Sequence, residues 1–529
     1  MRWIFLYFLL LSFPTLGQKA EFIKLEKLYA PETSLGIFSG WRQESLLIPI
    51  RFESLSVAAV DIQISIPGLQ PKMDWFEIHS VWADFSAGEC GQAKANGFFE
   101  KALIPDRARP LSTPKLEADS TVKWALLKMT IPRWAKSGDF DLAITFSQNE
   151  KSIQLKGIVK VLERVAPLVE EVAFEMDFWQ FPISVADYYG VKPWTEAHWL
   201  RMDEMFQSLR GINQRSLTVS IFWDLYNTKI RPLDEMMIQV TRKEDNSYSY
   251  DFSNLENYIT RAEKAGLLKQ ISIHNLFPWN KNFYFFDEKT NQIKTINAGP
   301  NSEAFRAFFK PLIQATSRFL EDNNWKSKTF WVIDERDPSL TITLKNWIDE
   351  IAPGFQYSYA GRLNSALARQ MEEYALPVNV SLDEARFSSR VAINGRTLMY
   401  TSCFEQANQP NSLMTSDLRD IYFLAHLADV RGYQGILHWA YNLWSKQIKT
   451  SGIYSDVPSG DAHFVYPDGE LSVRYLVFQD AIEQIGKFRL ISQVKNPSAI
   501  KQSLGRYFLI NVEKERFQAM EAMKMYLND

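Results

Sequence analysis

Strand-like and helix-like segments alternate along most of this chain, and that alternation limits the fold more than any other feature. From Glu170 onward, short apolar runs rich in β-branched and aromatic residues recur between amphipathic segments of helical period. The predicted strands are residues 172–178, 217–221, 270–274, 329–333, 355–359, 378–381, 398–402 and 435–439. Eight strand–helix repeats over about 320 residues are typical of a (β/α)8 barrel.

The segments between the strands support the same fold. Predicted helices are 195–209, 255–265, 302–320, 339–351, 363–374 and 417–430, with Thr195, Ser302, Ser339 and Asp417 as N-caps. The alternative is an open doubly wound sheet, which usually has a glycine-rich phosphate loop after its first strand. Because no such loop is present, a barrel over residues 170–490 is favoured, with a helical extension over 491–529.

The first third of the mature chain has a different hydrophobic pattern. Over residues 18–165, short apolar runs such as 45–51 and 140–146 alternate with turn signals, and no helical segment separates them. Strands at this spacing predict a β-sandwich. The expected fold class is therefore multi-domain β plus α/β, with an N-terminal β-sandwich followed by a (β/α)8 barrel, joined by a linker near Pro167.

The first seventeen residues have the pattern of a secretory signal peptide. Arg2 precedes an apolar run over 4–13, and small residues follow before Gln18. The run is too short to span a membrane, which needs about 20 apolar residues, and no later segment is long enough either. We therefore expect an exported protein, periplasmic or secreted.

Charge and metal-binding residues exclude several classes of function. With 59 basic and 62 acidic residues the net charge is −3, which gives no long-range attraction to nucleic acid. The six histidines are dispersed, and the two cysteines, Cys90 and Cys403, lie 313 residues apart in different predicted domains. The sequence predicts no metal, no cofactor and no bridge between these cysteines.

Paired carboxylates are the strongest candidates for chemistry. In a barrel, reacting groups lie at the C-terminal ends of the strands. Of six Asp-Glu dipeptides, only Asp334-Glu335 and Asp383-Glu384 follow predicted strands, and the first emerges directly from the apolar run 330–333. Adjacent acids favour split pKa values, which allow one protonated acid beside one ionised partner. The alternative is a structural ion pair with Arg336.

Aromatic residues gather at the same predicted face. The chain is 14% aromatic with 16 Trp, and several of these residues follow predicted strands: Trp179, Trp223, Trp279, Tyr359, Trp439, Tyr441 and Trp444. Aromatic rings stack on the C–H faces of sugars, while carboxylates and amides bind sugar hydroxyls. Carboxylates ringed by aromatic residues at a barrel mouth therefore indicate a carbohydrate substrate. The alternative is that these rings cap the barrel core.

Five stretches together resemble the catalytic domain of glycoside hydrolase family 123 and a related family of uncharacterised domains. They are residues 175–182, 191–194, 331–335, 435–444 and 460–474, and the likeness covers roughly 170–490. The resemblance implies a retaining exo-β-N-acetylgalactosaminidase with substrate-assisted catalysis, an exception to the scheme of two opposed carboxylates. In that scheme Glu335 protonates the glycosidic oxygen, and Asp334 orients the 2-acetamido group whose oxygen attacks the anomeric carbon.

Other residues are expected to contact the sugar. Tyr359 is the candidate to hold the acetamido oxygen, and either Asn442 or Asp461 the candidate for hydroxyls. The candidates for aromatic contact with the sugar are Trp179, Trp223, Trp439, Tyr441 and Trp444. The sequence departs from the family in placing Arg336-Asp337 between the acid pair and Pro338, which leaves the shape of the leaving-group side open.

Two other functions stay open on the sequence alone. A conventional two-carboxylate glycosidase would pair Glu335 with Glu384 or Asp383. A non-catalytic, exported glycan-binding protein would use the aromatic surface without turnover. In each case the partner is a glycan or glycoconjugate, and the oligomeric state is not predicted.

Overall fold

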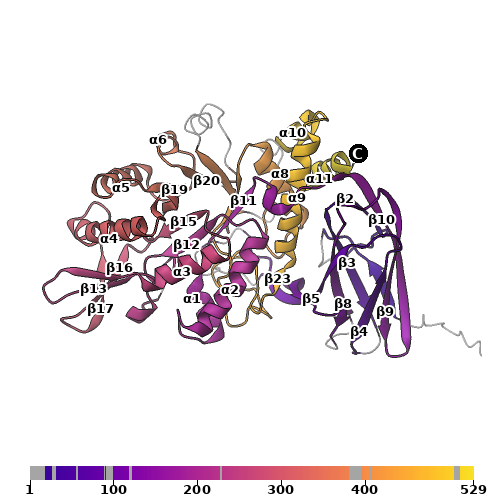
Figure 1. Ribbon diagram of the computed structural model, residues 1–529, viewed down its shortest axis with the longest axis horizontal. Coiled ribbons are helices and arrows are strands. Elements are labelled where there is room, and N and C mark those ends of the chain that lie inside the picture. Colours follow the sequence, from indigo (N-terminus) through magenta and orange to yellow (C-terminus); the bar gives the residue numbers. More distant parts are fainter. Residues whose placement is uncertain are drawn as a thin grey trace, which may run out of the picture.

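The structure is a computed structural model. It describes residues 18–528 except 27–30, 55–56, 88–89, 91–98, 118–121, 227–228, 380–394, 406–407 and 506–512. The predicted signal peptide and the Asp383-Glu384 pair lie outside the described residues. Figure 1 shows a strand-rich N-terminal body beside a larger body of strands rimmed by helices. Within the described ranges, no helix has the length and apolar character needed to cross a membrane.

The N-terminal body is a β-sandwich, as predicted. One sheet has the order β1-β3-β8-β5-β6-β23 and the other β2-β10-β9-β4-β7. Alternate residues such as Ile48, Ile50 and Phe52 are buried between the sheets, which is the period of two expected for strands with one solvated face. The strands are β1 (Lys19–Phe22), β2 (Ile37–Arg42), β3 (Ser45–Glu53), β4 (Val60–Ser65), β5 (Lys72–Asp84), β6 (Lys101–Pro110), β7 (Lys115–Leu116), β8 (Val122–Thr130), β9 (Gly138–Gln148), β10 (Lys151–Val165) and the distant β23 (Leu471–Ser472).

The second body contains the predicted parallel barrel. Its strands follow one another in the order β11-β22-β21-β20-β19-β18-β15-β12. They are β11 (Glu175–Phe178), β12 (Ser216–Ser220), β15 (Gln270–His274), β18 (Thr329–Asp334), β19 (Gln356–Ala360), β20 (Glu373–Pro377), β21 (Arg396–Tyr400) and β22 (Gly435–His438). Seven of them overlap the predicted ranges. The sixth prediction, 378–381, is wrong because β20 lies just before it.

Side chains help to close this barrel between its first two strands. A single bridge joins Met176 of β11 to Gln214, two residues before β12 begins. Beyond it, the Gln214 Oε1 atom accepts the Phe178 N–H at 2.9 Å, and the Gln180 Oε1 atom accepts the Thr218 N–H at 2.7 Å. The amide groups of these glutamines therefore satisfy backbone donors where a continuous ladder is missing.

Side-chain caps begin some of the barrel helices, whereas α8 begins after Leu418 with no side-chain cap from it, so the predicted cap Asp417 is wrong. Ser302 caps α4 by accepting the Phe305 N–H, and Asp337, rather than the predicted Ser339, caps α5 by accepting the Leu340 N–H. The predicted helix 363–374 is wrong, because only α6 (Ser365–Ala368) forms there. The other helices are α1 (Pro182–Tyr189), α2 (Glu196–Gly211), α3 (Ser253–Lys264), α4 (Glu303–Asp322), α5 (Pro338–Ile351), α8 (Arg419–Val430), α9 (Val473–Ile491), α10 (Ser498–Gly505) and α11 (Glu513–Asn528).

A small sheet inserted into the barrel loops was not predicted. It has the order β14-β13-β16-β17, with β13 (Gln239–Arg242), β14 (Tyr248–Asp251), β16 (Asn282–Asp287) and β17 (Gln292–Asn297). The Asp287 carboxylate ends β16 and pairs with Arg242 at 3.0 Å.

The two bodies are joined by buried contacts as well as by the chain. β23 pairs with β6, and Arg474 at the start of α9 forms a buried ion pair with Asp106 of β6 at 3.0 Å. Cys90 and Cys403 form a disulfide with their Cα atoms 5.0 Å apart, so the prediction of two separate cysteines is wrong. The fold brings the β5–β6 connection against the loop after β21, which sequence separation does not reveal.

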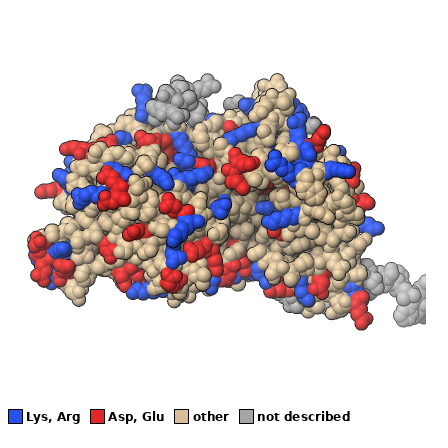
Figure 2. Space-filling model, viewed as in Figure 1, with Lys and Arg blue, Asp and Glu red and all other residues tan. Residues whose placement is uncertain are grey.

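The outer surface shows no extended patch of one charge on the side in view. Figure 2 shows basic and acidic side chains interspersed over both bodies, in keeping with the net charge of −3.

Candidate active site

The Asp334-Glu335 pair lies at the C-terminal end of a central barrel strand. Asp334 is the last residue of β18, and Glu335 has a φ of 47°, in the left-handed region. The Glu335 N–H donates to the Ala360 carbonyl at 2.9 Å, so the turn is fixed against β19. A non-glycine residue held in this conformation stores strain and is common at functional sites. The turn directs two consecutive carboxylates away from the strand.

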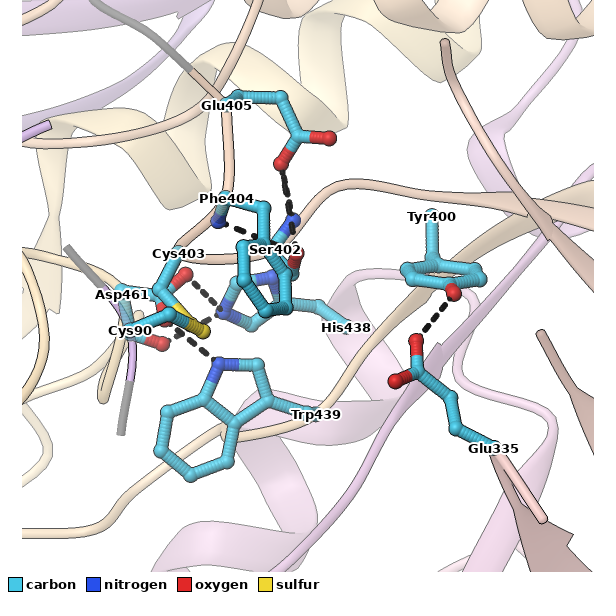
Figure 3. Close-up of a disulfide and its surroundings, with 10 residues drawn as sticks. All are labelled: Cys90, Glu335, Tyr400, Ser402, Cys403, Phe404, Glu405, His438, Trp439 and Asp461. Carbon is cyan, nitrogen blue, oxygen red and sulfur yellow. Dashed lines mark hydrogen bonds and ion pairs between the residues drawn. A yellow bond between two sulfur atoms is a disulfide. The ribbon is translucent and has the colours of Figure 1, made fainter. Parts of the chain in front are cut away.

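Each carboxylate has its own hydrogen-bond donor. The indole Nε1 atom of Trp279, in the loop after β15, donates to the Asp334 Oδ2 atom at 3.2 Å. The Tyr400 hydroxyl, at the end of β21, donates to the Glu335 Oε1 atom at 2.6 Å, as Figure 3 shows. Donors from the loop after β15 and from the end of β21 therefore hold the two acids separately.

The pKa of Asp334 is raised to about 6. Burial is the main cause, and the neighbouring Glu335 charge adds to it, whereas the Trp279 hydrogen bond and Arg336 oppose it. Arg336 does not clamp the pair in the way that the structural alternative required. Its guanidinium lies 3.7 Å from the centre of the Trp279 ring, and its Nε atom donates to the Phe277 carbonyl at 3.0 Å.

Figure 3 also shows two further acids, Asp461 at the left of the view and Glu405 at its top. The Trp439 Nε1 atom donates to the Asp461 Oδ2 atom at 2.7 Å, and the Glu405 Oε2 atom accepts the Ser402 N–H at 2.6 Å. Burial raises the pKa of each to about 7, and the Glu405 charge contributes to the shift of Asp461. The mouth thus carries several carboxyl groups in a poorly hydrated setting.

Aromatic side chains lie close to the acids. The ring of Tyr226, after β12, lies 5.9 Å from the ring of Trp439, and its pKa is raised by burial and by the charges of Asp334, Asp461 and Glu335. Asp224 contributes in the same direction, so the Tyr226 hydroxyl lies in the combined field of four carboxylates. An apolar floor lies below, formed by Trp179, Phe181, Val332, Leu398, Leu437 and their neighbours.

The predicted contact residues divide into two groups in the structure. Trp439, Asp461 and Tyr359 lie with the acid pair, and Trp179 is in the floor with its ring 4.6 Å from that of His274. The Tyr359 hydroxyl donates to the Arg336 carbonyl at 2.7 Å, so its hydrogen bond supports the loop after the pair.

The remaining four have their polar atoms bonded within the protein. The indole N–H of Trp223 donates to the Pro232 carbonyl and that of Trp444 to the Val465 carbonyl. The Tyr441 hydroxyl donates to Ser208 Oγ, and the buried Asn442 amide bonds both backbone groups of Phe181. These side chains pack and position the loops rather than face the acids with free polar atoms.

Three residues that face the acids were not predicted. Tyr400 lies in the predicted strand 398–402 and is the last residue of β21. The rule that functional groups lie at strand ends could therefore have identified it. Tyr226 and Glu405 lie in loops, where no periodicity fixes the direction of a side chain. Among the residues the structure describes, no group of three or more His, Cys, Asp or Glu side chains is arranged to hold a metal ion.

Comparison with known families gives one extended match. The sequence model of the family described as glycoside hydrolase 123, catalytic domain, matches residues 179–491, which is more than half of the chain. Comparison with curated proteins finds no match.

Solved structures give the same picture for the fold. A family 123 glycoside hydrolase from Clostridium perfringens, described in work on glycolipid glycan hydrolysis, superposes with a TM-score of 0.82 at 18% identity, covering 97% of this chain and 98% of that one. An endo-β-1,4-mannanase from Thermotoga petrophila has a TM-score of only 0.37 at 9% identity, covering 60% and 78%. The first likeness extends over sandwich and barrel together.

Proposed function

The chain belongs to glycoside hydrolase family 123, and on that premise we propose that it removes terminal β-linked N-acetylgalactosamine, or a related 2-acetamido sugar, with retention of configuration. The reaction is substrate-assisted and passes through an oxazolinium-type intermediate. The observation that carries the proposal is the Asp334-Glu335 pair at the end of β18, with a separate donor on each carboxylate.

Two adjacent acids suit a reaction in which the substrate supplies the nucleophile. Glu335 gives its proton to the glycosidic oxygen as the bond to the anomeric carbon breaks, and the aglycone leaves as an alcohol. The acetamido carbonyl oxygen attacks the same carbon from the opposite face, while Asp334 accepts a hydrogen bond from the acetamido N–H. Water then attacks the anomeric carbon as Glu335 takes its proton, and the bond between that carbon and the acetamido oxygen breaks, which restores the acetamido group. The two inversions give retention.

Asp334 suits its part in this scheme because its pKa is raised only to about 6. At neutral pH the carboxylate is ionised and can accept the acetamido N–H, and a poorly hydrated setting strengthens that hydrogen bond. Tyr226 is better suited than Tyr359 to hold the acetamido oxygen, because the Tyr359 hydroxyl already donates to Arg336. Trp279, with its side chain 53% exposed beside Asp334, offers a face to the sugar.

Export is part of the proposal. The Cys90–Cys403 disulfide supports an oxidising compartment, where such bonds form and persist. The glycolipid glycan in the work on the Clostridium perfringens protein makes a lipid-linked glycan one reasonable choice for a substrate panel.

A screen of aryl β-glycosides, with and without a 2-acetamido group, tests the proposal. We expect hydrolysis of 2-acetamido substrates alone, with release of the β-anomer first. Glu335→Gln and Asp334→Asn should each lose nearly all turnover. Asp337→Asn is the matched control, since it lies in the same loop and asparagine caps a helix about as well as aspartate. Equal hydrolysis of substrates lacking the acetamido group would favour a conventional glycosidase.

A further inference from the structure

The two oxygen atoms of the Glu335 carboxyl group lie in different surroundings. Oε1 accepts the Tyr400 hydroxyl at 2.6 Å, a distance typical of a hydrogen bond to a charged acceptor. Among the residues that the structure describes, none bonds Oε2, and Figure 3 shows that oxygen turned away from Tyr400. Glu335 is exposed, and Oε2 lies open to solvent. The protein therefore occupies one oxygen and leaves the other available to a substrate.

The barrel holds the Tyr400 ring in a fixed place. Tyr400 is the last residue of β21, it pairs with Leu437 of β22, and its carbonyl accepts the Val378 N–H at 2.9 Å. The residue is 7% exposed, and its ring packs in the apolar floor of the site. Within the described part of the chain, Glu335 is the one hydrogen-bond partner of its hydroxyl. A rigid ring therefore presents a single donor to the acid.

The Tyr400 hydroxyl keeps its own proton. Burial raises the pKa of Tyr400, and the charges of Glu335, Asp334 and Glu405 act in the same direction. The neutral phenol therefore donates to the carboxyl group and does not take a proton from it. If the proton of Glu335 were on Oε1, the phenolic proton would have no acceptor among the described residues. The proton of the acid thus belongs on Oε2.

We propose that Tyr400 is a positioning residue for the acid: by occupying Oε1 of Glu335, it places the transferable proton on Oε2, the oxygen that serves the glycosidic bond. The inference rests on the proposed function, because it takes Glu335 as the proton donor. Without this bond, an exposed glutamate side chain would exchange among several rotamers. Orienting a reacting group before the reaction removes an entropic part of the barrier.

The same hydrogen bond serves both steps of the reaction. In the first step, the bond between Oε2 and its proton breaks as the glycosidic oxygen gains that proton, and the electron pair stays on the carboxyl group. The negative charge is shared with Oε1, where the Tyr400 hydroxyl stabilises it. In the second step, Oε2 takes a proton from the attacking water and the charge disappears. Tyr400 gains and loses no proton, so it acts only through Glu335.

The dependence of the rate on the leaving group tests where the proton lies. A 2,4-dinitrophenolate leaves with little help from an acid, whereas a 4-methoxyphenolate needs the proton. Tyr400→Phe should lower kcat/KM about 10- to 100-fold for the 4-methoxyphenyl glycoside and less than about 3-fold for the 2,4-dinitrophenyl glycoside. For the first substrate the loss should fall on kcat rather than on KM. Glu335→Gln should show the same pattern with a larger difference between the two substrates.

Tyr357→Phe is the matched control. The Tyr357 hydroxyl, in β19, donates to the Asp349 Oδ1 atom at 2.7 Å near the C-terminal end of α5. This variant also removes a buried tyrosine hydroxyl from a carboxylate, but away from the acid pair. It should lower the melting temperature without changing the dependence on the leaving group. An equal loss on both glycosides for Tyr400→Phe would mean a merely structural role and would overturn the inference.

Binding keeps the two proposals separable. In a 2-acetamido sugar of galacto configuration fused to an imidazole, a ring nitrogen takes the place of the glycosidic oxygen and accepts the proton of the acid without turnover. By calorimetric titration, Tyr400→Phe should bind this compound about 10-fold more weakly than the wild type does, and free N-acetylgalactosamine less than about 3-fold more weakly. That result supports the inference even if no aryl glycoside is cleaved, in which case only the proposed function fails. Equal changes for both ligands, or an imidazole that binds the wild type no better than the free sugar does, overturn it.

Discussion

Both ends of the barrel contain acids removed from solvent, but the pKa values of these acids shift in opposite directions. At the N-terminal end, Glu373 is bonded to Arg396 at 2.6 Å, and Glu175 is bonded to Arg215 at 2.9 Å and Lys269 at 2.7 Å. Burial there would raise the pKa of both acids, yet the cations and their hydrogen bonds outweigh it and lower the pKa of each. At the C-terminal end, burial prevails and the pKa of Asp334 rises.

The difference separates acids that stabilise the fold from acids available for chemistry. A carboxylate bonded to a guanidinium stays ionised and contributes to folding, whereas a desolvated one near its titration range can exchange a proton. Asp177 shows that pKa alone is not enough. Its pKa is raised to about 7, but it is buried in β11 and accepts a hydrogen bond from Ser216. A place at the barrel mouth, and not the pKa alone, therefore separates the candidate functional acids.

The largest effect should come from removing the proton donor at the mouth. Glu335→Gln is expected to lower kcat by about 10²- to 10⁴-fold, the usual contribution of general acid–base catalysis, while the melting temperature changes little. Steady-state kinetics and thermal unfolding of the same preparation measure both. A variant that retains wild-type turnover would contradict the assignment of Glu335 as the proton donor at the C-terminal end of the barrel.

The opposite result is expected at the other end. Arg396→Met leaves Glu373 without its closest cation, so the free energy of unfolding should fall by about 3 kcal/mol. Turnover per folded molecule should stay unchanged. Urea unfolding measures the free energy of unfolding, and an active-site titration gives the turnover per folded molecule. A loss of kcat with normal stability would contradict the assignment of a purely structural role to this end of the barrel.

A smaller effect should link stability to the functional acid. Because the pKa of Asp334 is raised in the folded state, its ionised form disfavours folding above about pH 6, and this penalty disappears below about pH 4. Asp334→Asn should therefore stabilise the protein by about 1–2 kcal/mol at pH 7 while abolishing activity. Unfolding measured from pH 4 to 8 should show the gain only at the upper end; a destabilised variant at pH 7 would contradict it.

The smallest effect concerns the Trp279 hydrogen bond. That bond lowers the pKa of Asp334, which still lies at about 6 in the wild type. Protonation of Asp334 should therefore make kcat/KM decline below about pH 6. Trp279→Phe should move the decline to higher pH. Profiles of kcat/KM between pH 4 and 8 measure the shift, and a move to lower pH would show that another group controls that limb.

The barrel could be predicted from sequence because its strands are continuous apolar runs. The exception, β20, begins with the charged residue Glu373, which pairs with Arg396 at the start of β21. Its first two residues were therefore assigned to the predicted helix 363–374. The inserted sheet was missed for a related reason, since strands such as β17 are mostly exposed and polar. Tertiary partners, which the local pattern does not contain, decided both cases.

The site was predictable where a strand fixes direction and not beyond it. Asp334 ends β18 and Trp439 directly follows β22, so the strand-end rule located both. Tyr441 and Trp444 are only a few residues further, yet their polar atoms bond Ser208 and Val465. Glu405 and the Cys90–Cys403 bond depend on how the sandwich docks, which no segment of the barrel sequence specifies. The roles of all these residues, and export, stay predictions.

The most direct test of the central claim is inhibition by a thiazoline that mimics the cyclised 2-acetamido intermediate, measured in the wild type and in Asp334→Asn. If the substrate's acetamido group is the nucleophile and Asp334 accepts its N–H, the compound should inhibit the wild type far more strongly than N-acetylgalactosamine does. Its affinity should fall about 10- to 100-fold in the variant. No inhibition of an active wild-type enzyme, or equal inhibition of both proteins, would contradict the account.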